Sequence, residues 1–494
     1  MFVRIDPTWA PVAINAALDS ALPTNPGNRI QFNFPASNQY EKAPADGPIV
    51  ENLINTANRD NARPSEDTSL FVGFPYCIPT DGHNAGGLVT ADGCGFCGIP
   101  VVALRGAKHS LFDRYIAAVE REIEFQTSHV GLPMEVGAVF FGGGTPNLLS
   151  PAESAIFIGT VLAAFQPAPG AEVTWEGIPY LFRDKEKFDA LKNAGVNRVS
   201  IGAQSLNPRV IQHTGRFTQT RAGVELAVQH ARDVGFEHSV DLIYGLPAQT
   251  YDDALEDVRT LVAWKIPHLT IYPLNQVPGL SAFSAEPYAS LCAAIPERLR
   301  MYHGIRDFLL SQGYRQVTMS DFEIDDDRSH YEYENKSHDP LKNDWWALGY
   351  MGHHRRVGQY DRPGFSYLAP EDLGEYYAQL DKGRLPVRAT FRFEPVDVRL
   401  SYLLNQLQRM RLDANAYEVL FGIDLLEEYR NLWDALLARG WIEIKDNVIQ
   451  LIGDAVFYTA LIQRALTFAR DRELKARSTA RIAGWKAHES INTE

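Results

Sequence analysis

Hydrophobic residues follow two alternating patterns between about residues 69 and 320. Short runs rich in β-branched and aromatic residues predict strands, and longer stretches with apolar residues every three or four positions predict helices. In the first long stretch, Phe112, Ile116, Val119 and Ile123 lie at helical spacing after Ser110, a candidate N-cap. The short runs predict six strands, at 70–74, 138–141, 173–176, 198–201, 240–243 and 269–272.

Strands that alternate with helices predict an α/β fold, because right-handed crossovers place successive strands parallel in one sheet or barrel. Ligands of such sheets bind at the carboxyl ends of the strands. Three cysteines, a glycine run and several polar residues of this chain fall at predicted strand ends. We therefore expect the functional site at that edge of the sheet.

The flanking regions differ from this core. Residues 1–64 are rich in Pro, Asn and Asp and are expected to form an N-terminal extension, followed by the core at 65–325 and a connecting segment at 326–385. Residues 386–494 predict two helices at 397–411 and 424–439, two short strands at 441–444 and 448–451, and a final helix. This order is similar to that of a winged-helix module.

Charge bears on what this C-terminal domain does. The chain has 494 residues and a net charge of −14, which opposes nucleic-acid binding and favours a packing role for the domain over a DNA-binding one. Basic residues between Arg464 and Lys486 are expected to form a solvated helix face, with a partner-docking surface as the alternative.

Composition indicates a globular protein, with 45% hydrophobic and 22% charged residues. The longest strongly apolar stretch, about 155–165, is roughly half as long as a bilayer span. The N-terminus lacks the basic and apolar regions of a secretory signal, so we expect a cytoplasmic protein with no membrane association.

Three of the four cysteines suit a metal site. The Cys94-Gly-Phe-Cys97 pair has a spacing common to zinc and iron–sulfur centres, and Cys77 precedes it by a loop of sixteen residues. Lengthening that loop from three to sixteen residues costs only about 1.5 kcal/mol of closure entropy. A structural metal site returns roughly 10 kcal/mol. The insertion is therefore compatible with a shared centre.

Two kinds of centre fit these thiols. A zinc site would take His83 or His109 as its fourth ligand, whereas an iron–sulfur cluster held by three cysteines would keep one iron open to a small molecule. Cys292 stands alone and is expected to be a small buried hydrophobe. The polar residues at the other strand ends favour the cluster.

Those residues begin with the run Gly142-Gly143-Gly144-Thr145-Pro146, whose glycines let backbone approach a ligand. A tight turn would explain the run equally well. Each polar residue further along could form an ordinary ion pair, but a carboxylate can hold an amine or ribose hydroxyls and an arginine can hold a carboxylate. Together they suit a zwitterionic, nucleoside-like ligand; the residues are Glu176, Gln204, Arg216 and Asp241.

With these motifs the chain resembles the radical S-adenosylmethionine (SAM) enzymes, in particular the oxygen-independent coproporphyrinogen III oxidase branch. The motifs that carry the resemblance lie at 74–77 (Phe-Pro-Tyr-Cys), 140–146, 197–207 and 241–247. The resemblance implies a partial (β/α)6 barrel of the radical SAM type with a C-terminal helical, winged-helix-like domain.

The resemblance also implies cofactors and site residues. Cys77, Cys94 and Cys97 would hold a [4Fe-4S] cluster, Phe96 would pack beside SAM, and a second SAM would lie near Ile243 and Asn275. A small-molecule substrate and a flavodoxin- or ferredoxin-like electron donor are implied, with cleavage of SAM to a 5′-deoxyadenosyl radical. The implied SAM-binding residues are Gly143, Gly144, Thr145, Glu176, Gln204, Arg216 and Asp241.

Some residues depart from the branch. Phe71 and Gly73 replace a tyrosine and a histidine of the oxidase, and residues 272–279 are closer to radical methyltransferase relatives. The favoured hypothesis is therefore radical C-methylation, or a related modification, of a conjugated tetrapyrrole or natural-product substrate. The alternatives are coproporphyrinogen oxidation and a noncatalytic heme chaperone, for which His353 or His354 would be candidate ligands. No catalytic residue of the protein itself is assigned.

Overall fold

The computed structural model describes residues 5–23, 34–43, 67–78, 94–104, 108–130, 134–276, 281–326 and 328–491. The chain divides into two compact units, one formed by Lys42–Pro395 and the other by Met1–Glu41 together with Val396–Glu494. The four-part division of the sequence analysis stays a prediction.

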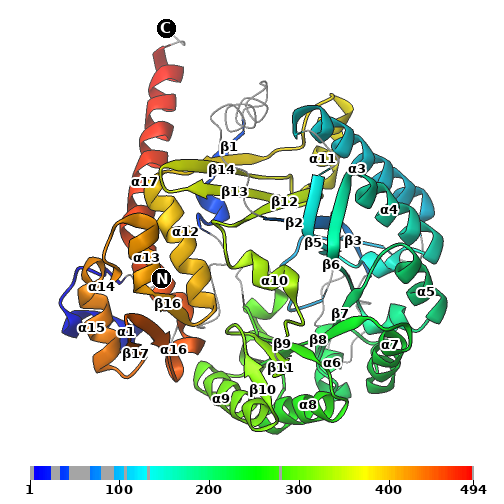
Figure 1. Ribbon diagram of the computed structural model, residues 1–494, viewed down its shortest axis with the longest axis horizontal. Helices are drawn as coiled ribbons and strands as arrows, with labels where there is room; N and C mark the ends of the chain where they lie inside the picture. Colours follow the sequence, from blue (N-terminus) through cyan, green and yellow to red (C-terminus); the bar gives the residue numbers. More distant parts are fainter. Residues whose placement is uncertain are drawn as a thin grey trace. The chain divides into compact units, whose positions relative to one another are not determined.

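The centre of the larger unit is a run of parallel strands (Figure 1). Six of them follow the chain in order, and each pairs in parallel with the next. They cover every predicted strand: β2 (Asp67–Phe74), β5 (Met134–Gly143), β6 (Phe165–Gly177), β7 (Arg198–Gln204), β8 (Glu237–Tyr244) and β9 (His268–Pro273). The predicted α/β fold with a parallel sheet is confirmed, and the sheet is open.

Further strands extend this sheet at both sides. The strand β12 (Asn343–Gly349) pairs in parallel with β2, and antiparallel β13 (His353–Gln359), β14 (Arg362–Leu368) and β15 (Ala389–Arg392) follow, with β1 (Glu41–Lys42) at the edge. Beyond β9 lie β11 (Asp321–Ile324) and β10 (Tyr314–Gln316). The segment 326–385, expected as a connection, thus contributes three strands to the sheet.

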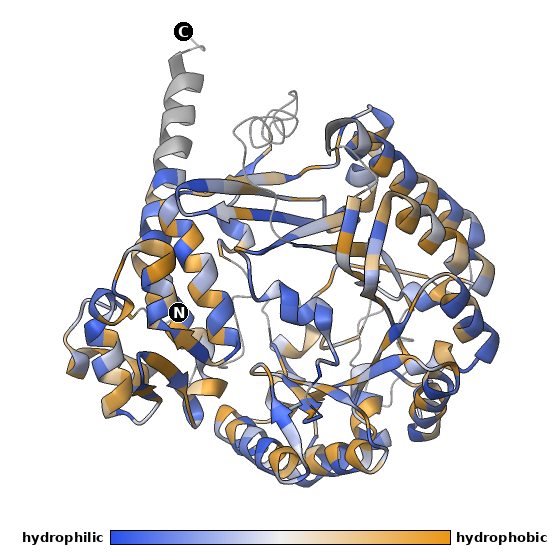
Figure 2. Ribbon diagram, viewed as in Figure 1, coloured by the Kyte–Doolittle hydropathy of each residue, from blue (hydrophilic) through white to orange (hydrophobic). Residues whose placement is uncertain are grey.

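Helices lie around the outside of the curved sheet (Figure 1). Hydrophilic and hydrophobic residues alternate along them, as expected of helices that cover one face (Figure 2). α3 begins at His109, so Ser110 lies in its first turn and does not cap it. The helices of this unit are α3 (His109–Val130), α4 (Pro151–Ala164), α5 (Lys185–Asn193), α6 (Pro208–Thr214), α7 (Arg221–Val234), α8 (Tyr251–Ala263), α9 (Ile295–Ser311), α10 (Glu332–Ser337) and α11 (Leu373–Asp381).

Local sequence explains where these elements begin and end. Ser150 and Glu153 form a capping box at the start of α4, and Gly235, with φ 78°, ends α7. Every residue of β7 is buried, as expected of a parallel strand covered on both faces.

The smaller unit joins both ends of the chain. Residues 454–491 form α16 (Asp454–Phe457) and α17 (Thr459–Ile491). The helices, hairpin and final helix predicted here are present. The other elements are α1 (Pro11–Ala21), α12 (Pro395–Gln408), β16 (Arg411–Asp413), α13 (Ala414–Phe421), α14 (Leu425–Glu428), α15 (Arg430–Ala438), β17 (Ile442–Lys445) and β18 (Val448–Leu451).

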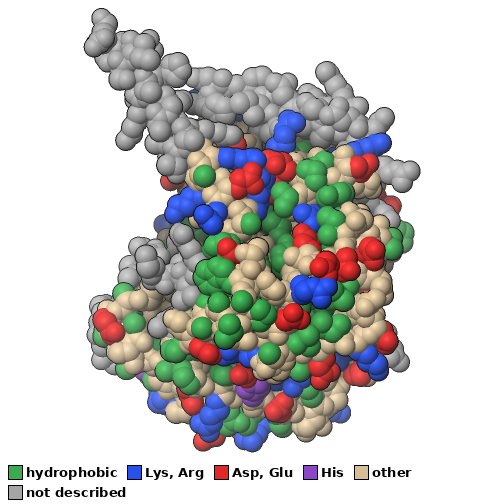
Figure 3. Space-filling model, turned by 90° about the vertical axis from the view of Figure 1, so that its left-hand side faces the viewer, with side chains coloured by type: hydrophobic (Ala, Val, Ile, Leu, Met, Phe, Trp, Pro, Cys, Tyr) green, Lys and Arg blue, Asp and Glu red, His purple; other side chains and the backbone are tan. Residues whose placement is uncertain are grey.

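The surface drawn in Figure 3 carries Lys and Arg side chains scattered among acidic and apolar ones, with no continuous basic area among the residues that are coloured there. Within the described part of the chain, no helix is both long and apolar enough to cross a bilayer.

Candidate functional site

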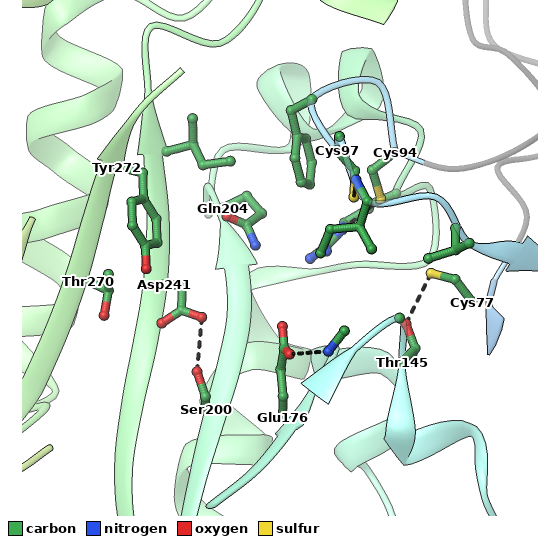
Figure 4. Close-up of a pocket in the computed structure, with 18 of the residues that line it drawn as sticks. Cys77, Cys94, Cys97, Thr145, Glu176, Ser200, Gln204, Asp241, Thr270 and Tyr272 are labelled. Carbon is green, nitrogen blue, oxygen red and sulfur yellow. Dashed lines mark hydrogen bonds between the residues drawn. The ribbon is translucent and has the colours of Figure 1, made fainter. Parts of the chain in front are cut away.

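A cavity of about 550 Å³ lies at the carboxyl ends of the parallel strands, in the size range of small-molecule sites. Figure 4 shows residues from several strands converging on it. Every residue that lines it belongs to the larger unit. The residues that the sequence analysis named and that line it are Cys77, Cys94, Phe96, Cys97, Gly143, Gly144, Thr145, Glu176, Gln204, Arg216, Asp241 and Ile243.

Backbone hydrogen bonds place the three cysteines on one side of this cavity (Figure 4). Cys77 ends the short strand β3 (Tyr76–Cys77), which pairs with β4 (Val102–Ala103). In the loop between Cys94 and Cys97, the Gly95 carbonyl accepts a hydrogen bond from the Ser281 hydroxyl at 2.9 Å. Both ends of the cysteine-bearing segment are therefore held to the core.

The three thiols line the cavity together, and burial affects the protonation of two of them. Burial raises the pKa of Cys77, and it raises that of Cys97 to about 12, so metal binding at these two thiols must displace protons. Among the described residues, no three His, Cys, Asp or Glu side chains converge closely enough to hold a single metal ion.

The zinc alternative finds no support among these residues. His109 Nδ1 lies 2.6 Å from a carboxylate oxygen of Glu153. The His109 side chain is exposed and does not line the cavity. His83 lies outside the described residues.

The glycine run brings backbone to the cavity as predicted. Gly143 has φ 103°, a conformation that side chains disfavour. Gly144 donates its N–H to the Phe74 carbonyl at 2.8 Å, and a Cβ there would lie 2.4 Å from the Tyr76 carbonyl oxygen. Only glycine fits at position 144, because the backbone there lies directly against the Phe74 and Tyr76 carbonyl groups.

Two carboxyl groups face the cavity from β6 and β8, the strands on either side of β7 (Figure 4). Glu176 accepts the Gly143 N–H at 3.1 Å, and burial, then repulsion from Asp241, raises its pKa to about 8. Asp241 accepts the Ser200 hydroxyl at 3.0 Å, and burial raises its pKa to about 6. A bound cation would stabilise the ionised form of both carboxyl groups.

Gln204 reaches the cavity because β7 is irregular at its end. Its φ is 67°, and the register between β7 and β8 shifts between Gly202 and Gln204. Such a bulge turns a side chain that would otherwise follow the strand's alternation. Arg216 lies nearby, with its Nε 3.2 Å from the Cys94 sulfur and its Nη1 donating to the Gly202 carbonyl.

A buried polar network lies beside the cavity. Arg198 donates to His268 Nδ1 at 2.9 Å, so the other ring nitrogen carries the proton that reaches Asp321 at 3.2 Å. The Arg198 guanidinium also lies 4.0 Å from the ring centre of Tyr331, which lines the cavity. This network fixes one wall of the site.

Asn275 is the one named cofactor residue that does not line the cavity, and it is exposed. Several lining residues were not predicted. Phe140, Ser200 and Tyr272 belong to segments that the sequence analysis quoted, whereas Tyr331 comes from the expected connecting segment. The unpredicted lining residues are Gly98, Ile99, Pro100, Val101, Phe140, Ser200, Thr270, Tyr272, Ala282 and Tyr331.

Phe71 and Gly73, the residues that depart from the oxidase branch, pack closely against their neighbours. The Phe71 ring stacks on Phe140 with centroids 6.2 Å apart, and a Cβ at Gly73 would lie 2.1 Å from the Tyr350 carbonyl oxygen. His353 and His354 lie on β13 and do not line the cavity. His354 is fully buried, and its ring lies 4.0 Å from that of Trp346 and 4.7 Å from that of Tyr367.

These residues fit SAM as well as the cluster. The ligand carries two cationic groups and a carboxylate, and the cavity offers two half-buried carboxyl groups and one guanidinium. The backbone at Gly143 and Gly144 leaves room for close approach. The roles of the individual residues stay predictions.

Comparison with known proteins agrees with this site. Residues 91–261 match the model of the Radical SAM superfamily. The chain is 25% identical over 445 residues to an oxygen-independent coproporphyrinogen III oxidase of Pseudomonas aeruginosa, covering 86% of this chain and 90% of that one. It is 31% identical over 259 residues to the radical S-adenosyl methionine domain-containing protein 1 of Bos taurus, covering 52% and 54%.

The fold agrees too. The coproporphyrinogen III oxidase structure from Escherichia coli superposes with a TM-score of 0.72 at 20% identity, covering 88% of this chain and 96% of that one. The predicted radical SAM fold is confirmed. Proteins of this superfamily use a [4Fe-4S] cluster and SAM. The chain therefore carries a radical SAM domain at 91–261 and is similar over most of its length to oxygen-independent coproporphyrinogen III oxidases.

Proposed function

We propose that the enzyme carries out an oxidative decarboxylation of the coproporphyrinogen type. Three cysteines on one wall of an acidic cavity at the strand ends are the observation that carries the radical chemistry. The oxidase direction is supported by relatives of that name, one of which aligns over 86% of this chain. This replaces the methyl transfer that the sequence alone favours.

A cluster held by the three cysteines, together with bound SAM, would supply reductive cleavage of a carbon–sulfur bond and so a 5′-deoxyadenosyl radical. The chain's own residues position and shield the reacting groups. Glu176 and Asp241 would hold the cationic part of SAM, and Arg216 would hold its carboxylate through the guanidinium nitrogens that do not reach Cys94.

Aromatic side chains would separate the reacting groups from water. Four of them line the cavity: Phe96, Phe140, Tyr272 and Tyr331. In the oxidase reaction a hydrogen atom would pass from a propionate side chain of the substrate to the 5′-deoxyadenosyl radical, giving 5′-deoxyadenosine. Carbon dioxide would then leave and a vinyl group form as the remaining electron passes to a one-electron acceptor. The electron for SAM cleavage would come from a flavodoxin- or ferredoxin-like donor, and we place the enzyme in the reducing cytoplasm, where its thiols stay available to iron.

Product analysis tests this proposal. The anaerobically reconstituted enzyme is given reductant, SAM and coproporphyrinogen III, and products are measured by mass spectrometry. We expect 5′-deoxyadenosine together with carbon dioxide and loss of propionate carboxyl groups. S-adenosylhomocysteine with a methylated substrate would favour methyl transfer instead. Heme binding without turnover of SAM would indicate a chaperone.

A further inference from the structure

Each cysteine of the cavity lies within hydrogen-bonding distance of one donor. The Thr145 hydroxyl is 3.0 Å from the Cys77 sulfur, and Arg216 Nε is 3.2 Å from the Cys94 sulfur. The Ile99 N–H donates to the Cys97 sulfur, with 3.5 Å between nitrogen and sulfur. The first of these contacts is drawn in Figure 4.

The Thr145 contact is held in place by the backbone. Thr145 is 1% exposed and donates its N–H to the Tyr76 carbonyl at 2.8 Å, next to the strand end that carries Cys77. A sulfur bound to iron has no proton, so the hydroxyl must be the donor in this pair.

Arg216 is fixed by three contacts. Its Nη1 donates to the Gly202 carbonyl, its Nε reaches Cys94, and its guanidinium carbon lies 5.3 Å from the ring centre of Phe96. The remaining nitrogen is available for a ligand, so the contact with Cys94 does not exclude the role proposed above.

We propose that Thr145 and Arg216 set the reduction potential of the cluster by donating hydrogen bonds to Cys77 and Cys94. Reduction adds negative charge to the irons and their sulfurs, and hydrogen bonds to the sulfurs stabilise that charge. The low dielectric constant of a buried site strengthens this electrostatic stabilisation. Both residues are therefore positioning residues that favour the reduced state needed for SAM cleavage. The inference rests on the cluster of the proposed function.

The test is a redox titration of the reconstituted cluster followed by electron paramagnetic resonance, without SAM or substrate. Thr145→Val keeps the shape of the side chain and removes the donor, whereas Thr145→Ser keeps the hydroxyl. We expect the valine variant to lower the reduced-to-oxidised ratio at fixed potential by roughly threefold to tenfold, and tenfold corresponds to ~59 mV for one electron.

Thr270→Val is the matched control, because the Thr270 hydroxyl also lies at the cavity but donates to Asp321. We expect this variant and Thr145→Ser to keep the wild-type potential. An unchanged potential in Thr145→Val, with the cluster fully assembled, would overturn the role of Thr145. Arg216→Gln tests the second donor in the same way and should also lower the reduced-to-oxidised ratio of the cluster at fixed potential.

If these variants fail to assemble the cluster, the wild-type enzyme is measured instead. Electron–nuclear double resonance of the reduced cluster in D₂O should then show exchangeable deuterons coupled to it, and their absence would contradict the proposal. Because none of these measurements contains SAM, a failed decarboxylation assay with shifted potentials would reject the proposed function and leave this inference standing.

Discussion

Glu176 and Asp241 are two half-buried carboxyl groups of the cavity whose pKa values are raised toward neutrality, to about 8 and about 6. Bound cations stabilise the ionised forms, so SAM binding at low pH must first release protons. We expect the affinity for SAM to rise with pH through this interval and to level off above it. Calorimetric titration of the enzyme with SAM across the interval measures this dependence.

The control for this prediction is Glu176→Gln, which removes the group with the higher pKa and should flatten the upper part of the pH dependence. Its affinity should also be lower than that of the wild type at high pH. A wild-type affinity that does not change with pH would contradict a role of these carboxylates in holding the cationic ligand.

At the scale of elements, Glu122 connects α3 to two neighbours. Its carboxylate accepts the Tyr376 hydroxyl of α11 at 2.7 Å and the Gly349 N–H of β12 at 2.8 Å, and Glu122 is 2% exposed. Replacement by alanine would leave buried donors without an acceptor, at about 1–3 kcal/mol each. We expect Glu122→Ala to lower the free energy of unfolding of the larger unit, measured with denaturant.

Glu124→Ala, at an exposed position on the same helix, is the comparison and should change the free energy of unfolding by less than about 0.5 kcal/mol. Equal losses in the two variants would show that helix propensity, and not the buried acceptor, decides the effect. The Glu122 carboxyl also predicts a pH effect, because burial raises its pKa to about 7. Because the pKa of Glu122 is higher in the folded than in the unfolded protein, the contribution of this group to folding stability declines as the pH rises from the unfolded pKa to the folded pKa.

The elements show what the sequence could predict. The six central strands were predictable because each is a short apolar run between helical patterns. The strand β12 was not, because its glycine-bearing sequence is typical of a connection and its partner β2 is remote in the chain. Gln204, a predicted SAM-binding residue, lines the cavity, but its φ of 67° at a bulge has no local signal in a non-glycine residue.

At the scale of the whole molecule, the smaller unit is built from both ends of the chain. In it, Asn15 Nδ2 donates to the Ala435 carbonyl at 3.1 Å, across 420 residues of sequence. The sequence analysis assigned residues 1–64 to an extension, because a contact between distant segments leaves no periodic pattern. The amphipathic character of α1 is visible in its buried residues Ile14 and Leu18.

Leu18→Ala should therefore destabilise the smaller unit by about 2–5 kcal/mol, because Leu18 is 2% exposed and truncation leaves a cavity. Differential scanning calorimetry of the full chain would report the shift. Val12→Ala is the matched variant on the same helix, since Val12 is 78% exposed. A similar shift in both variants would contradict the packing of α1 as a structural part of this unit.

The central claim is that three cysteines hold a cluster that cleaves SAM. The most direct measurement quantifies 5′-deoxyadenosine after anaerobic reconstitution and reduction in the wild type, Cys94→Ala and Cys292→Ala. Cys292 does not line the cavity and serves as the matched control. We predict product in the wild type and in Cys292→Ala and none in Cys94→Ala. Equal product in all three proteins, or none in a wild type with a complete cluster supplied with substrate, would contradict the account.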